Sequence, residues 1–267
     1  MKLQLVPART GLLWVRLGAR VFWRQPMALT ALFFLCMGCI SVVTLLPIVG
    51  TVLALAMIPF ITLLMMVAAA QTHLGKQPVP ALLMAALRSG RERARDLVVL
   101  GLLYAGCFLL VLALSALIDG GEFARVYMGT AQLTREMAES PEFETAMWLS
   151  VLLYLPLSLL FWHAPGLVHW WGVPPLKAMF FSLIACLRNL GAFTVYGLGW
   201  AGVFMATGIV VSLVLTVASE LGMGTGMITS LLVTTAIVLA AMFFCSVVFS
   251  FRDCFEPPDA PTNATPD

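Results

Sequence analysis

The chain has 267 residues, of which 61% are apolar and 10% are charged. Soluble domains contain about 45–50% apolar and about 25% charged residues, so this composition excludes a soluble globular protein. The formal net charge is only +2, and the information in the charges lies in their positions along the chain.

Six long apolar segments predict six transmembrane helices. A helix needs about 20 apolar residues to cross a hydrocarbon layer of about 30 Å, and none of the six segments contains Lys, Arg, Asp or Glu. They cover about 27–48, 51–72, 97–118, 146–165, 192–217 and 227–250. We therefore predict an all-α polytopic membrane domain over 1–252, with its spans in three hairpins, and a disordered tail over 253–267.

The basic residues are distributed unequally between the two sides of these spans. Thirteen of the 15 Lys and Arg residues precede the first, third or fifth span or follow the sixth. Because basic residues are retained on the cytoplasmic side, the bias predicts that both termini are cytoplasmic. The segment over 119–145 carries six acids and two arginines. We expect it to be periplasmic, with one helix over about 123–139 that covers the outer ends of the spans.

Three segments predict cytoplasmic surface helices, one before each odd-numbered span. They cover about 8–24, 79–95 and 174–188. In the first segment, arginines form one stripe at 100° per residue, and Trp14, Gly18, Val21 and Phe22 lie on the opposite side. A basic stripe with an aromatic-rich reverse face is typical of an interfacial helix whose rings lie at headgroup depth. The third segment is more apolar, and we expect it to pack beneath protein.

The arginines of the first two surface segments are the candidate contacts for anionic lipid. They are Arg9, Arg16, Arg20, Arg24, Arg88, Arg91 and Arg95. Each such charge contributes about 1 kcal/mol near an anionic leaflet. A second interpretation is that these residues only set the topology of the chain.

Two prolines lie within predicted spans, and we expect helix kinks at both. Pro59 and Pro156 each occupy the second helix of a predicted hairpin, where proline removes one backbone donor. Such kinks would open a cleft for a small uncharged or amphipathic solute. A facilitator or transporter is therefore the alternative function, although the spans offer few polar side chains to line a path.

The sequence predicts no catalytic, cofactor-binding or metal-binding residues. A GxGxxG pattern over 197–202 and a CxxC pattern over 36–39 both lie inside predicted spans, where small residues serve helix packing. His163 and His169 would lie about 240° apart on one helix, which is poor for shared metal ligation. No span carries the charged residue that an ion-coupled carrier requires. We expect a non-enzymatic protein without a cofactor.

Several motifs, spread over nearly the whole chain, are similar to one known family. They are VPAR over 6–9, LLPIVG over 45–50, FWHAP over 161–165 and VPPLKAMFFS over 173–182. On these residues the chain resembles multi-spanning inner-membrane proteins of unknown function from betaproteobacteria. The resemblance implies a bacterial inner membrane and six helices, and it brings no activity with it. Our leading hypothesis is a protein that binds anionic lipid or another membrane protein, with no nucleic-acid partner.

Overall fold

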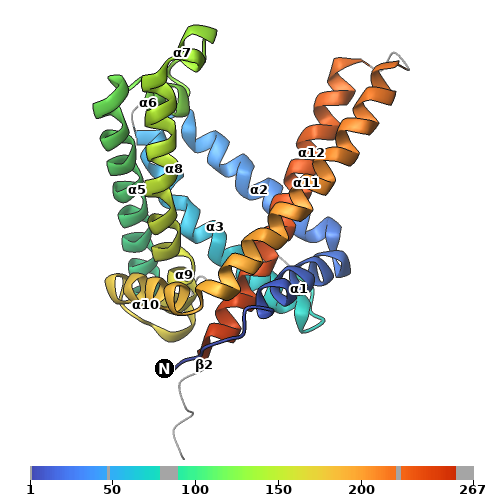
Figure 1. Cartoon of the computed structure of the whole chain (residues 1–267). Coiled ribbons are helices and arrows are strands. Elements are labelled where there is room, and N and C mark those ends of the chain that lie inside the picture. Colours follow the sequence, from blue (N-terminus) through green and yellow to red (C-terminus); the bar gives the residue numbers. More distant parts are fainter. Residues whose placement is uncertain (1, 47–48, 79–89, 221–223, 257–267) are drawn as a thin grey trace, which may run out of the picture. The chain divides into compact units, whose positions relative to one another are not determined.

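The computed structural model describes residues 2–46, 49–78, 90–220 and 224–256, and its elements are mainly helices (Figure 1). In chain order they are β1 (Lys2–Leu3), α1 (Thr10–Arg24), α2 (Pro26–Thr44), α3 (Val49–His73), α5 (Arg91–Asp119), α6 (Glu122–Tyr127), α7 (Arg135–Glu139), α8 (Pro141–Phe161), α9 (Ala164–Trp171), α10 (Pro175–Arg188), α11 (Leu190–Glu220), α12 (Thr225–Cys254) and β2 (Phe255–Glu256).

Six described segments are long and apolar enough to cross a membrane. They are Pro26–Thr44, Val49–His73, Arg91–Asp119, Pro141–Trp171, Leu190–Ala218 and Thr225–Cys254. This confirms the predicted all-α polytopic class with six spans, whereas the arrangement in three hairpins remains a prediction. Helix α5 begins at Arg91, earlier than the predicted start near 97, because helical hydrogen bonding continues through its charged first turns.

The described residues form two compact units. The first contains those of Met1–Cys36, Leu64–Leu87 and Ile184–Asp267, and the second contains those of Met37–Leu63 and Arg88–Leu183. Helices α2 and α3 therefore contribute residues to both units. Of the predicted surface helices, the segment about 79–95 falls largely on 79–89, outside the described residues, and Arg91–Arg95 belong to α5 itself.

The prediction of a disordered tail that begins at residue 253 is wrong for residues 253–256, which are helical or in a strand. Helix α12 continues to Cys254, and Phe255–Glu256 form β2. Strand β2 pairs antiparallel with β1, so that Lys2 lies opposite Glu256 and Leu3 opposite Phe255. The rest of the predicted tail, 257–267, lies outside the described residues.

In the first unit, α1 lies against α11 and α12 (Figure 1). At two glycines of α1 the neighbouring helix is so close that no side chain would fit. A Cβ atom on Gly11 would lie 2.0 Å from the carbonyl oxygen of Ala192, and one on Gly18 would lie 2.3 Å from Cβ of Ser246. Because Gly11 and Gly18 are seven residues apart, they lie on the same face of α1. These glycines bring the backbone of α1 directly onto the two spans.

Hydrogen bonds made by buried side chains stabilise the same packing. The indole Nε1 of Trp14 donates to Oδ2 of Asp253 at 2.9 Å. The hydroxyl of Ser246 accepts from Nε1 of Trp200 at 3.2 Å and lies 2.6 Å from the hydroxyl of Tyr196. Trp14 and Ser246 are fully buried, so these bonds satisfy polar groups that have no access to water.

Within the first unit, Asn189 holds the N-terminal segment against the junction of α10 and α11. Its Oδ1 accepts from the backbone N–H of Val6 at 2.8 Å, and its Nδ2 donates to the carbonyls of Gln4 and Ala185 at 3.0 Å each. Asn189 is buried between α10 and α11. One amide therefore fixes the segment that leads into α1.

In the second unit, α5 packs along α8 (Figure 1), and aromatic rings fill the contact. The ring centroid of Tyr104 lies 5.1 Å from that of Phe161, and the centroid of Phe108 lies 6.0 Å from that of Tyr154. Edge-to-face pairs of this kind add about 0.5–1.5 kcal/mol beyond their buried area. The rings thus account for the close pairing of these two spans.

The prediction of one helix over 123–139 is wrong, because the structure has two short helices, α6 and α7, in this segment. Helix α6 ends where the N–H of Gly129 bonds to the carbonyl of Val126 and the N–H of Thr130 bonds to that of Arg125. Gly129 has φ of 71°, and a left-handed glycine in this pattern terminates a helix. Helix α6 nevertheless contacts both α5 and α8, as expected for a segment that covers their ends.

The fourth span is interrupted between α8 and α9, and the sequence did not predict α9. Pro165, in the first turn of α9, has no N–H to continue the helix. The N–H of His163 bonds instead to Oγ of Ser182 at 2.9 Å, and that hydroxyl donates to the carbonyl of Leu159 at 2.7 Å. In a continuous helix the N–H of His163 would bond directly to the carbonyl of Leu159. Here the hydroxyl of Ser182, from α10, lies between these two groups and bonds to both.

We predict that Gly18→Ala lowers the stability of the purified protein by about 1–3 kcal/mol, the cost of overpacking a close contact. Gly197→Ala is the matched control, since a Cβ atom on that glycine of α11 meets nothing within 4 Å. Thermal unfolding in detergent measures both changes. Equal losses in the two variants would contradict the close approach of α1 to α12.

We also predict that Ser182→Ala destabilises the protein by about 1–3 kcal/mol, because the N–H of His163 and the carbonyl of Leu159 both lose their hydrogen bond to this hydroxyl. Ser158→Ala is the control, because that hydroxyl donates to the carbonyl of Leu155 within its own helix. Hydrogen exchange at the α8–α9 junction should increase in the first variant alone. Unchanged exchange in both would show that Ser182 does not support the break.

Candidate functional site: the basic face of α1

The exposed face of α1 combines arginines with apolar side chains. At 100° per residue, the outward residues fall within an arc of about 120°. They are Arg9, Leu12, Leu13, Arg16, Arg20, Trp23 and Arg24, all exposed. Trp23 has 67% of its surface exposed, and Leu13 has 46%, so the face is amphipathic rather than simply charged.

The opposite face of α1 determines this orientation. The buried residues of the helix are Gly11, Trp14, Val15, Gly18, Val21 and Phe22. They occupy the other side of the helix at the same angular spacing, and they pack against α11 and α12. Because this side is fixed to protein, the arginines have to point away from it.

The buried rings correct the sequence interpretation of α1. Trp14 and Phe22 were expected at headgroup depth, but they are 0% and 1% exposed. The centroid of Trp14 lies 5.3 Å from that of Phe193 and 5.9 Å from that of Tyr196. The aromatic ring of α1 that is exposed to an interface is instead Trp23, the neighbour of Arg24, which lies on the same side as the arginines.

Arg24 has a structural partner that separates it from the other arginines. At the end of α3, the carbonyls of residues 70–72 accept from the backbone N–H groups of residues 74–76. The carbonyl of His73 accepts instead from Nη1 of Arg24 at 3.0 Å. A cation at a helix C-terminus is favourable because it faces the negative end of the helix dipole. Arg24 therefore caps α3.

Arg9, Arg16 and Arg20 are the available cations of this face. Within the part of the chain that the structure describes, the ion pairs are Arg135–Glu139 and Arg252–Asp253, and neither involves these three residues. Their guanidinium groups are exposed and can donate to phosphate oxygens in bidentate geometry. The face can bind anions without giving up a contact of the fold.

The other predicted site residues lie elsewhere. Arg88 is outside the described residues, and Arg91 and Arg95 lie in the first turns of α5, in the second unit. Pro59 lies inside α3 and Pro156 inside α8, and both helices continue through them. The predicted kinks, and a role for Arg88, Arg91 and Arg95 in lipid binding, remain predictions.

Side chains suited to metal binding or nucleophilic chemistry are dispersed. Among the residues described, no group of three or more His, Cys, Asp or Glu is placed to bind a metal ion. Cys186 of α10 is fully buried, and burial raises the pKa of its thiol. A thiol that stays protonated is a packing group rather than a nucleophile.

The chain is similar to a protein of Burkholderia thailandensis that is described as a probable inner membrane protein. The two are 38% identical over 266 residues, which cover 98% of this chain and 97% of the Burkholderia protein. No family model matches the chain, and no solved structure matches it.

Proposed function

The chain belongs to the same family as this Burkholderia thailandensis protein, and from that premise we propose that α1 of this integral inner membrane protein binds anionic phospholipids. The proposed activity is binding, without catalysis and without a cofactor. The ligand is the phosphate of a lipid headgroup, and the binding residues are Arg9, Arg16 and Arg20.

The observation that carries the proposal is the one-sided attachment of α1. One face is packed on α11 and α12, while the other presents three exposed arginines beside Leu12, Leu13 and Trp23. Apolar side chains at an interface enter the boundary between headgroups and acyl chains, and arginines bind the phosphates above it. At about 1 kcal/mol each, the three cations supply about 3 kcal/mol.

The proposal also places both termini in the cytoplasm. Anionic lipid of the inner leaflet attracts basic segments, and six residues separate α1 from the N-terminal strand. The antiparallel pairing of β1 with β2 holds residues 2–3 and 255–256 together. This pairing supports a common side for the two ends, and the Lys and Arg bias supports the cytoplasmic side.

We predict that changing Arg9, Arg16 and Arg20 together to Gln reduces the enrichment of phosphatidylglycerol around the protein by tenfold or more. About 3 kcal/mol corresponds to roughly a hundredfold in affinity, and part of it will be lost to screening. Full-length protein in nanodiscs of mixed phosphatidylcholine and phosphatidylglycerol, with retained lipid quantified by mass spectrometry, measures the ratio.

The matched control changes Arg125 and Arg135, the two arginines of the segment between the third and fourth spans, to Gln. It should leave the lipid ratio unchanged. If the triple variant also retains the normal ratio, the arginines of α1 only set topology and the proposal fails. Purified protein is used so that altered insertion cannot imitate lost binding.

The proposed orientation predicts that Thr130→Cys is labelled by a membrane-impermeant maleimide in intact spheroplasts, whereas Gln77→Cys is not. Both residues are exposed in the structure, and along the chain Gln77 precedes the third span, Arg91–Asp119, whereas Thr130 follows it. The six native cysteines are first replaced by Ala or Ser. Labelling at Gln77 with protection at Thr130 would invert the topology and remove α1 from the anionic leaflet.

A further inference from the structure

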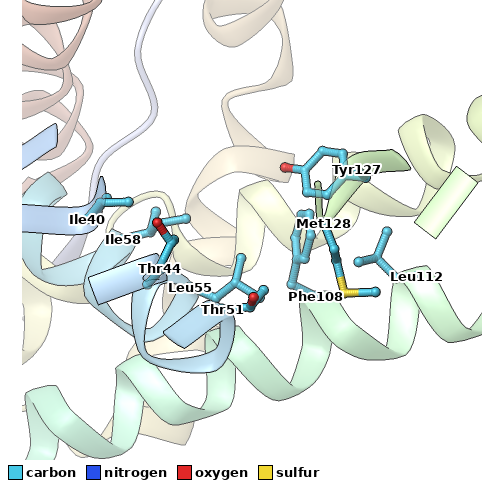
Figure 2. A pocket seen from close by; sticks show the side chains of 10 residues that line it. Ile40, Thr44, Thr51, Leu55, Ile58, Phe108, Leu112, Tyr127 and Met128 are labelled. Carbon is cyan, nitrogen blue, oxygen red and sulfur yellow. The ribbon is translucent and has the colours of Figure 1, made fainter. Parts of the chain in front are cut away.

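The second unit contains a pocket of about 230 Å³ between the end of α2, the beginning of α3, α5 and the end of α6 (Figure 2). Figure 2 shows Ile40 and Thr44 on one side and Phe108 and Leu112 on the other, with Tyr127 and Met128 next to them. None of the ten described side chains that line the pocket is charged. A neutral ligand is therefore the chemical class that its walls accept.

The walls of the pocket are held in place by contacts of their own. A Cβ atom on Gly101 would lie 2.3 Å from the carbonyl oxygen of Ala56, so α5 and α3 meet at backbone distance. The ring of Tyr127 lies 5.4 Å from that of Phe108. Met128 is positioned where Gly129 ends α6. A site that exists before its ligand arrives loses less ordering entropy on binding.

The lining of the pocket combines three hydroxyl groups with apolar side chains. On α2, Thr44 is the last helical residue and Ile40 lies one turn inside; on α3, Thr51 is near the start and Ile58 lies about 10 Å further along the axis. The hydroxyls of Thr44, Thr51 and Tyr127 thus lie toward the helix ends. The other lining side chains are apolar; they are Ile40, Ala54, Leu55, Ile58, Phe108, Leu112 and Met128.

We propose that this pocket binds an uncharged single-chain amphipath, with its hydroxyl or ester group at the threonines and its chain against the apolar lining side chains. An apolar cavity of about 150 Å³ is large enough for benzene, so this pocket takes a ring-sized or short-chain group and is too small for a whole phospholipid. The pocket shares no residue with the exposed face of α1, and its chemistry does not depend on the arginines there.

The test uses octanol that carries a diazirine on its chain as a photolabel, with the full-length protein in liposomes. We expect saturable labelling of peptides from the pocket, with excess octanol as an effective competitor. Ala54→Leu, which adds volume to the buried pocket wall, should reduce this labelling by about tenfold. Ala113→Leu on the exposed side of α5 should leave it unchanged.

Two further measurements distinguish specific binding of an amphipath from non-specific occupation of the pocket by lipid acyl chains. Thr51→Val keeps the shape of the side chain and removes its hydroxyl, so octanol should compete several-fold less well in this variant. Octane and octanoate should compete poorly against the unmodified protein. Labelling that does not saturate, that survives Ala54→Leu, or that octane suppresses as well as octanol would overturn the proposal.

Discussion

The contact of Gly18 with Ser246 determines the orientation of α1, and the proposed binding face follows from it. Apolar burial gives little driving force between helices in lipid, so association depends on small residues and on hydrogen bonds. Both are present here, because a glycine admits the backbone of α1 and Ser246 also bonds to Tyr196 and Trp200. The arginines are exposed as a consequence of packing on the other face.

The spans were predictable because their cause is local. A helix in hydrocarbon must satisfy its backbone internally and present about 20 apolar residues, and both requirements can be read from one segment at a time. The bounds were less accurate because a helix does not end where its apolar residues end. Helix α5, for example, already begins at Arg91, directly after the N-cap residue Gly90, and includes charged residues that precede its first apolar run.

The packing of α1 was not predictable from its own residues. Periodicity separates two faces, but both carry aromatic and aliphatic side chains, and only the partner decides which is buried. Trp14 is buried against α11 and α12, where Asp253, 239 positions away in sequence, accepts its indole N–H. The interruption at His163 has the same origin, because its partner Ser182 belongs to another helix. Such long-range pairs leave no periodic signal in a single sequence.

The attachment of α1 also bears on how its charges act. A flexible basic tail loses chain entropy each time it binds a membrane surface, whereas α1 is ordered by Gly18, Trp14 and the capping of α3 by Arg24 before any lipid arrives. Arg9, Arg16 and Arg20 therefore start from fixed backbone positions, and less of the electrostatic attraction is offset by ordering. Retaining basic residues on one side of the membrane and binding lipid with them are compatible roles, because the first acts during insertion and the second on the folded helix.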